Sequence, residues 1–289
     1  MGAAGLVLSV GFFLSASALA SGSEWSVVVT PAGVSQGGVV GIQVAGEEIQ
    51  TMKGSLGHRE IPFFGGQGVF SALIGVDLEE RPGAAGLILQ GWSRSGERKE
   101  RKVTLHVRKK KFPQEKLSVP ASFDRIDEAT KRRIDREQEQ LNGLWTASSL
   151  ERRWEGAFLA PVSGGVTSPF GLRRIVNGLP RSPHGGVDLK ASLGSEVLAA
   201  NHGRLVLREE FFFSGKSIVL DHGGGLYTMY FHLDEFHTDK DAQVRKGDLI
   251  GRAGMTGRVT GPHLHWGVRL NGARVDPFAL LEATVRRLD

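Results

Sequence analysis

The segment that decides the fold of the C-terminal half is residues 261–270, with the sequence GPHLHWGVRL. Apolar residues occupy every second position: Leu264, Trp266, Val268 and Leu270. This period of two predicts a β-strand with one buried face. The opposite face then carries His263, His265, Gly267 and Arg269. Two imidazoles therefore project side by side, which fits either a chemical site or a polar surface strand with incidental histidines.

Two further histidine segments precede this strand. Residues 184–188 read HGGVD, and the paired glycines disfavour a helix, so His184 and Asp188 are predicted on a bend that leads into a strand. Residues 217–233 have the pattern of a β-hairpin with a glycine-rich turn. In its return strand, alternation puts Tyr230 and His232 on one face. We assign His222 a structural role at the turn, whereas the role of His232 depends on finding a partner.

Composition narrows the chemistry. Glycine supplies 40 of 289 residues without a Gly-X-Y period, which indicates many turns and favours β structure. The chain has no cysteine, which excludes disulfides, thiol nucleophiles and Cys-ligated metal sites. A metal would therefore be held by His, Asp or Glu. The net charge of +5 suits an anionic partner without selecting one.

The N-terminus has the pattern of an export signal. Residues 1–20 carry no charged side chain, and the apolar run at 6–14 precedes the small-x-small pattern ALA at 18–20. This favours a cleaved signal peptide over residues 1–20. A membrane anchor is the alternative if the segment is not cleaved, and its short, diluted apolar stretch disfavours that reading.

The rest of the chain divides into three zones. Residues 22–110 contain short β-type runs at 27–29, 39–44, 72–76, 87–89 and 103–107, typical of a β-sandwich. Residues 111–155 form a charged connector with a helix predicted at 123–144. Its balanced charge argues against a nucleic-acid arm, and it is either a spacer or an inhibitory cover. Residues 156–289 return to glycine-punctuated strands.

Together, the three histidine segments resemble the lysostaphin-like (LytM-type) zinc metallopeptidases, which cut peptide cross-links of bacterial cell walls. The resemblance covers about residues 157–278 and includes the phrases at 161–173 (PVSGGVTSPFGLR), 230–233 (YFHL), 244–248 (VRKGD) and 254–265 (GMTGRVTGPHLH). The ordered set H-x-x-x-D, Y-x-H-L and H-L-H is far more specific than any single motif. Residues 22–110 resemble, more weakly, the immunoglobulin-like β module of some exported members.

The resemblance implies an antiparallel β peptidase domain with a groove, and zinc (Zn2+) bound by His184, Asp188 and His265. It implies catalytic roles for His232 and His263. Two imidazoles and a carboxylate leave the fourth tetrahedral position open, as in catalytic zinc sites. Arg173 matches the Gly-x-Arg phrase of the family, and either meets a substrate carboxylate or braces a loop.

We therefore predict a mainly β, exported zinc metalloendopeptidase that hydrolyses peptide cross-links of peptidoglycan in the periplasm or cell envelope. The direct D-alanyl cross-link is favoured over a glycine bridge. The alternative function is a non-catalytic regulator whose groove binds another cell-wall hydrolase. All five matched positions are intact, which favours the enzyme. No nucleic-acid partner is expected, and the oligomeric state is left open.

Overall fold

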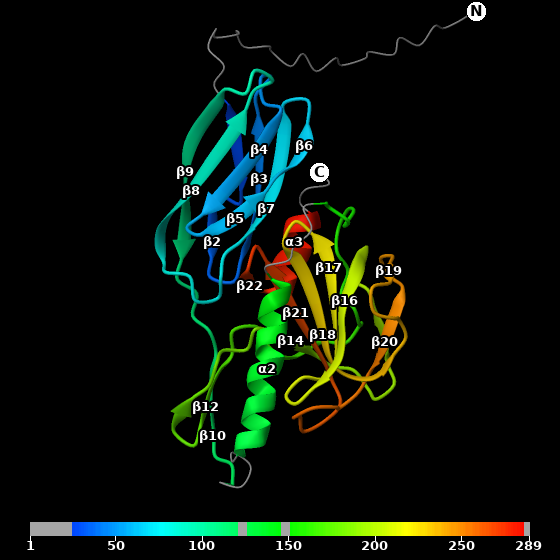
Figure 1. Cartoon of the computed structure of the whole chain (residues 1–289). Coiled ribbons are helices and arrows are strands. Elements are labelled where there is room, and N and C mark those ends of the chain that lie inside the picture. Colours follow the sequence, from blue (N-terminus) through cyan, green and yellow to red (C-terminus); the bar gives the residue numbers. More distant parts are fainter. Residues whose placement is uncertain (1–24, 121–125, 146–150, 286–289) are drawn as a thin grey trace, which may run out of the picture.

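The computed structural model describes residues 25–120, 126–145 and 151–285, and it is mainly β (Figure 1). The predicted signal peptide at residues 1–20 lies outside this range. Among the described residues, no helix has both the length and the apolar character needed to cross a bilayer. The N-terminal strands and the large C-terminal sheet are separated in sequence by the connector that carries helix α2.

The N-terminal part is a two-sheet sandwich around one core. One sheet has the order β1 (Ser26–Thr30), β3 (Val39–Ala45), β7 (Val69–Gly75) and β6 (Phe64–Gly66). The other has the order β2 (Gly33–Ser35), β9 (Arg98–Arg108), β8 (Gly83–Trp92), β4 (Thr51–Leu56) and β5 (Arg59–Pro62). In β9 the expected alternation holds, because Leu105 and Val107 are buried and His106 is exposed. Side chains from both sheets share this core, as a sandwich requires.

The connector holds a strand as well as the expected helix. β10 (Gln114–Leu117) pairs in parallel with β12 (Arg173–Val176), which pairs with β13 (Leu179–Pro180). Every residue of β10 is exposed, so this strand has no apolar alternation by which the sequence could have predicted it. The prediction of a purely helical connector was therefore incomplete. Helix α2 (Glu128–Leu144) begins after Asp127, whose side chain caps it by accepting the Thr130 N–H. The predicted start at residue 123 falls outside the described residues.

The C-terminal part is built on one large, mostly antiparallel sheet. Its main path is β11 (Val166–Ser168), β14 (Gly186–Leu189), β21 (Leu264–Leu270), β18 (Leu226–Phe236), β17 (Gly215–Gly223), β16 (Gly203–Phe211) and β19 (Gln243–Val244). Beside it lie β15 (Glu196–Leu198), β20 (Leu249–Ala253) and β22 (Ala273–Val275), and helix α3 (Pro277–Val285) follows. One face of the sheet carries the main core, with Trp266 and Tyr230 at 0% exposure and Leu280 of α3 packed among them.

The other face of the sheet carries a smaller apolar cluster, formed by Leu207, Phe211, Val219, Tyr227 and Met229. Leu141 and Leu144 of α2, together with Trp145, pack against it. In Figure 1, α2 accordingly runs alongside the large sheet. The two faces of one sheet are thus covered by different parts of the chain.

Residues 75–79 of the sandwich are bound directly to β22 and its neighbours. The Arg274 side chain donates to Asp77 at 2.7 and 3.2 Å and to Glu79 at 2.8 Å. Burial alone would raise the pKa of Asp77, but the hydrogen bonds from Arg274 outweigh it and lower that pKa. A backbone hydrogen bond adds to these contacts, because Leu78 N–H donates to the Arg274 carbonyl. The sandwich and the sheet therefore share one interface of ionic and backbone contacts.

Candidate metal centre

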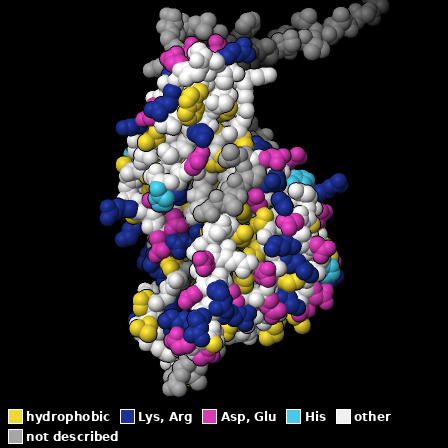
Figure 2. Space-filling view, viewed as in Figure 1, with side chains coloured by type: hydrophobic (Ala, Val, Ile, Leu, Met, Phe, Trp, Pro, Cys, Tyr) yellow, Lys and Arg dark blue, Asp and Glu magenta, His cyan; other side chains and the backbone are white. Residues whose placement is uncertain are grey.

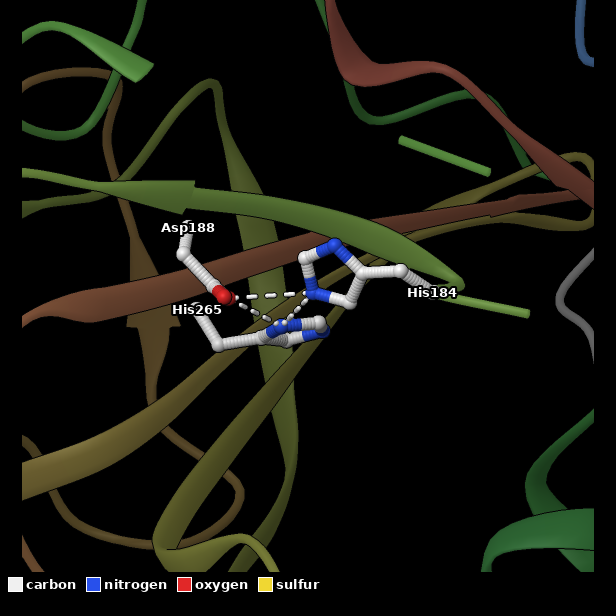
Figure 3. A group of neighbouring side chains, drawn as sticks. All are labelled: His184, Asp188 and His265. Carbon is white, nitrogen blue, oxygen red and sulfur yellow. Dashed lines mark hydrogen bonds and ion pairs between the residues drawn. The ribbon is translucent and has the colours of Figure 1, made fainter. Parts of the chain in front are cut away.

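Two neighbouring strands and the bend before one of them bring His184, Asp188 and His265 together. β14 and β21 pair with Asp188 opposite His265, so both side chains point to the same face. His265 Nδ1 lies 2.9 Å from Asp188 Oδ1, and His184 Nε2 lies 3.0 Å from the same oxygen. His184 Nε2 is also 2.9 Å from His265 Nδ1. Figure 3 shows the three donor atoms converging on one point.

The glycine before Val187 allows this approach. A Cβ on Gly186 would lie 2.5 Å from the Trp266 carbonyl oxygen and 2.8 Å from His265 Nε2. Both distances are shorter than atoms tolerate, so a side chain here would push β14 away from β21. The predicted entry into a strand holds for His184, which lies two residues before β14, whereas Asp188 lies within the strand and not on the bend before it.

The donor set fits zinc. His184 Nδ1 lies 3.0 Å from the Pro169 carbonyl, so in the neutral ring Nδ1 donates there and Nε2 keeps the lone pair that a metal would use. Burial alone would raise the pKa of Asp188, but the adjacent imidazoles of His184 and His265 outweigh it and hold that pKa well below its usual range. Burial lowers the pKa of His265. Neutral imidazoles and an ionised carboxylate are the forms that bind metal.

His263 and His232 lie beside this group. His263 Nε2 is 3.8 Å from Asp188 Oδ1, and the ring centroids of His232 and His263 are 4.8 Å apart. Each ring is held by a backbone carbonyl on its Nδ1, from Gly261 at 2.9 Å for His263 and from Thr256 at 3.0 Å for His232. Their Nε2 atoms are thereby left without a proton in the neutral rings. The five predicted residues form one cluster.

The position of His232 corrects the hairpin prediction. Simple alternation placed it on the face of Tyr230, but Tyr230 is fully buried in the main core, whereas the His232 ring lies 6.2 Å from that of His265. The register of β17 and β18 shifts here, because Lys216 pairs with Leu233 and Ile218 pairs with Tyr230. His232 has a φ of 64°, a left-handed conformation that is uncommon outside glycine. This bulge turns its side chain to the other face of the sheet.

Sequence reasoning missed the residues that support the cluster. The Phe231 ring stacks on His265, with centroids 5.3 Å apart and planes at 6°. Ser168 Oγ lies 3.4 Å from His184 Nδ1 and accepts a hydrogen bond from Arg174 at 3.1 Å. Ser168 and Thr256 both lie inside phrases that carry the family resemblance, which was the available signal.

The remaining candidates lie away from the cluster or in the core. The Arg173 side chain is exposed on β12, and its backbone N–H donates to Pro113, so its role in substrate binding stays a prediction. His222 is fully buried in β17, where Nδ1 lies 2.6 Å from the His202 carbonyl and Nε2 lies 2.7 Å from Thr228 Oγ1. These contacts agree with a structural role, although His222 lies within the strand. His237 is exposed.

Comparisons with known proteins agree with this geometry. Residues 182–277 match the family model "Peptidase family M23". The DD-carboxypeptidase/endopeptidase Mpg of Neisseria meningitidis is 36% identical over 115 residues, which are 40% of this chain and 26% of Mpg. The peptidoglycan DD-endopeptidase ShyA of Vibrio cholerae is 35% identical over 112 residues, 38% of this chain and 26% of ShyA. The chain thus spans about a quarter of the length of these curated relatives.

The solved structures extend the similarity beyond the matched segment. A crystal structure from Pseudomonas aeruginosa, described as a peptidase M23, superposes with a TM-score of 0.67 at 26% identity. The match covers 86% of this chain and 95% of that one. The resemblance to LytM-type peptidases and the mainly β architecture are both confirmed.

Proposed function

We propose, from the match of residues 182–277 to peptidase family M23, that this protein is an exported zinc endopeptidase that hydrolyses peptide cross-links of peptidoglycan. The observation that carries the proposal is the convergence of His184, Asp188 and His265 within 3.0 Å of one another. Two further imidazoles beside them are arranged for proton transfer. A purely structural metal site would not need those two groups.

Each residue has a proposed task. His184, Asp188 and His265 would hold zinc, which when bound acts as a Lewis acid that polarises the scissile carbonyl and activates water. His263 would accept a proton from the attacking water on its free Nε2 and return it to the leaving amine. His232 presents an unprotonated Nε2 because its Nδ1 donates to Thr256. It is therefore better suited to orient the water than to donate to the developing oxyanion.

The D-alanyl cross-link is the proposed substrate bond. Support comes from ShyA, named a peptidoglycan DD-endopeptidase, and from Mpg, named a DD-carboxypeptidase/endopeptidase. Peptidoglycan as the substrate in the name of ShyA supports a periplasmic or envelope location. Specificity for that bond must come from contacts of the groove with residues flanking it, because a Lewis acid attacks any amide held in position.

The test is digestion of purified sacculi by the full mature chain with and without a chelator, followed by mass spectrometry of the fragments. Conversion of cross-linked dimers into monomers, lost on chelation and restored by zinc, is the expected result. His237→Ala, which changes an exposed residue away from the cluster, serves as the matched control and should digest normally. Cleavage of pentaglycine without loss of dimers would overturn the choice of bond.

The alternative, a regulator that recruits another hydrolase, makes the opposite prediction. It would bind sacculi without releasing fragments, whether zinc is present or not. The complete donor set favours the enzyme, since a regulator has no use for an open metal position.

A further inference from the structure

The face that carries the metal centre continues along β18 and β21 beyond Phe231. The strands pair Phe231 with His265, Met229 with Gly267, and Tyr227 with Arg269. Side chains at alternate positions share a face, so the next four residues past the metal centre lie on its face. We call these residues, Tyr227, Met229, Gly267 and Arg269, the groove strip. The strip is a direct extension of the site.

Helix α2 and Trp145 lie over this strip. The Trp145 ring centroid is 5.1 Å from that of Tyr227, and the Arg269 guanidinium is 5.3 Å from the Trp145 ring. The Tyr227 hydroxyl donates to the Leu144 carbonyl at 2.9 Å. Figure 1 shows α2 running alongside the large sheet. The surface next to the metal centre is thus occupied by the chain itself.

The helix is held lightly. None of residues 128–144 is fully buried, and the partly buried positions form a single stripe at Thr130, Ile134, Glu137, Leu141 and Leu144. Its other positions are exposed, and the surface in this region carries Lys, Arg, Asp and Glu side chains together (Figure 2). Because the side chains of α2 are only partly buried, the helix can separate from the sheet without opening the main core. Such a segment is among the parts of a protein that open locally at the lowest free-energy cost.

A second set of contacts joins α2 to the β16–β17 hairpin, which also contacts His232. Glu137 accepts the Phe212 N–H at 2.9 Å, and Arg133 donates to the Glu210 carbonyl at 3.1 Å. Two residues further, the Ser214 carbonyl accepts the His232 N–H at 2.9 Å. The tip of the β16–β17 hairpin therefore contacts both the helix and His232.

We infer that the groove strip is a substrate subsite and that α2 with Trp145 is its removable cover. The inference rests on the proposed function and adds where the substrate lies. The Met229 side chain folds over Gly267, where a Cβ would lie 2.7 Å from Met229 Cε. Met229 and Tyr227 thus supply an apolar floor, and Arg269 supplies a guanidinium. This combination suits an extended peptide that ends in a free carboxylate. The substrate reaches Arg269 only when Trp145 has left it.

A reversible cross-link tests the cover. The chain has no cysteine, so Arg133→Cys with Glu210→Cys gives one addressable pair that a bis-methanethiosulfonate reagent joins and a reductant releases. In the linked protein, turnover of a purified cross-linked muropeptide dimer should fall by about tenfold or more, because the open form is no longer populated. Reduction should restore it. Equal rates before and after linking would overturn the inference.

The matched control is Arg132→Cys with Arg136→Cys, which links two exposed positions within α2 and leaves the helix free to move. This linked control should keep the unlinked rate. Arg269→Gln should raise KM for the acidic dimer in the unlinked protein and have no such effect on a dimer whose carboxylates are amidated. An equal change for both dimers would remove Arg269 from the subsite.

Failure of the cover and failure of the proposed function give different results. If the unlinked protein with zinc does not cleave the dimer at all, the proposed function fails. Hydrogen exchange then addresses the cover separately, with the dimer added to the His263→Ala protein. Faster exchange of the amides of residues 128–144 on binding supports displacement of α2, whereas unchanged or slower exchange contradicts it.

Discussion

The two faces of the large sheet are built from the same strands and differ in chemistry around the candidate metal centre. On the core face, Trp266 and Tyr230 are wholly excluded from water. On the site face, the side chains of the three candidate ligands and His263 keep 10–19% exposure. In β21 the two sets alternate residue by residue, with His265 between Leu264 and Trp266. A rigid core face therefore fixes the backbone from which each chemical group projects.

This difference predicts that substitutions of the site residues change metal binding or turnover, whereas substitutions on the core face change the free energy of unfolding. The largest effect should follow from removing a ligand. Asp188→Ala or His265→Ala leaves two donors, too few for a stable zinc site. Zinc content should fall from about one per chain to nearly none, and hydrolysis of sacculi should cease. Metal analysis beside circular dichroism checks this, and full zinc occupancy in either folded variant would refute the ligand assignment.

Substitution of the two histidines beside the candidate ligands should separate metal binding from proton transfer. His263→Ala and His232→Ala should retain zinc, and turnover should fall by about 10²- to 10⁴-fold, the usual cost of a lost proton-transfer group. The experiment compares kcat with bound zinc in the same preparations. A variant that kept the wild-type rate would show that its histidine has no part in the reaction.

On the core face, Trp266→Ala should lower the free energy of unfolding by about 3–5 kcal/mol, since it leaves a large cavity in a close-packed region. Trp266→Phe keeps an aromatic ring and should cost less. Urea titration gives both values. The contrast between the faces would fail if Trp266→Ala abolished zinc binding while the free energy of unfolding stayed unchanged.

The smallest effect concerns the buried histidine on the core face. Burial lowers the pKa of His222 to about 4, whereas the unfolded chain binds that proton near pH 6.5. Acidification from about pH 6.5 to about pH 4 therefore favours the unfolded state, by up to about 3 kcal/mol. The His222→Gln protein should lose less stability over this interval than the wild type. Thermal or urea unfolding at pH 7.5 and 4.5 measures the difference, and parallel losses would contradict it.

Much of this arrangement was predictable because a strict period of two determines which residues share a face. The alternation in residues 264–270 placed Trp266 in the core and His265 opposite, as observed. It failed at His232, because a bulge depends on the pairing of two strands and leaves no mark on the local pattern. The family resemblance had still selected His232, because a motif match depends on the order of residue types in the sequence and not on which face of the sheet each side chain occupies.

Two features depended on tertiary contacts that no local pattern reports. β10 is fully exposed and owes its strand conformation to pairing with β12. The narrow apolar stripe of α2 favoured a solvated connecting helix, whereas Leu141 and Leu144 pack against the sheet. In both cases the missing information was the identity of the partner, which comes from far away in the chain.

The Arg274–Asp77 contact has a consequence for how the molecule melts. Because side-chain and backbone bonds cross from β22 to residues 77–79, the sandwich and the sheet each lose partners when the other unfolds. Calorimetry should then record one heat-absorption peak for the whole chain, in place of the two peaks expected for two domains that unfold independently. For the same reason, a fragment cut at residue 156 would expose Arg274 and the residues of β22 that the sandwich covers in the whole chain, and a sandwich grafted onto another protein would need β22 with it.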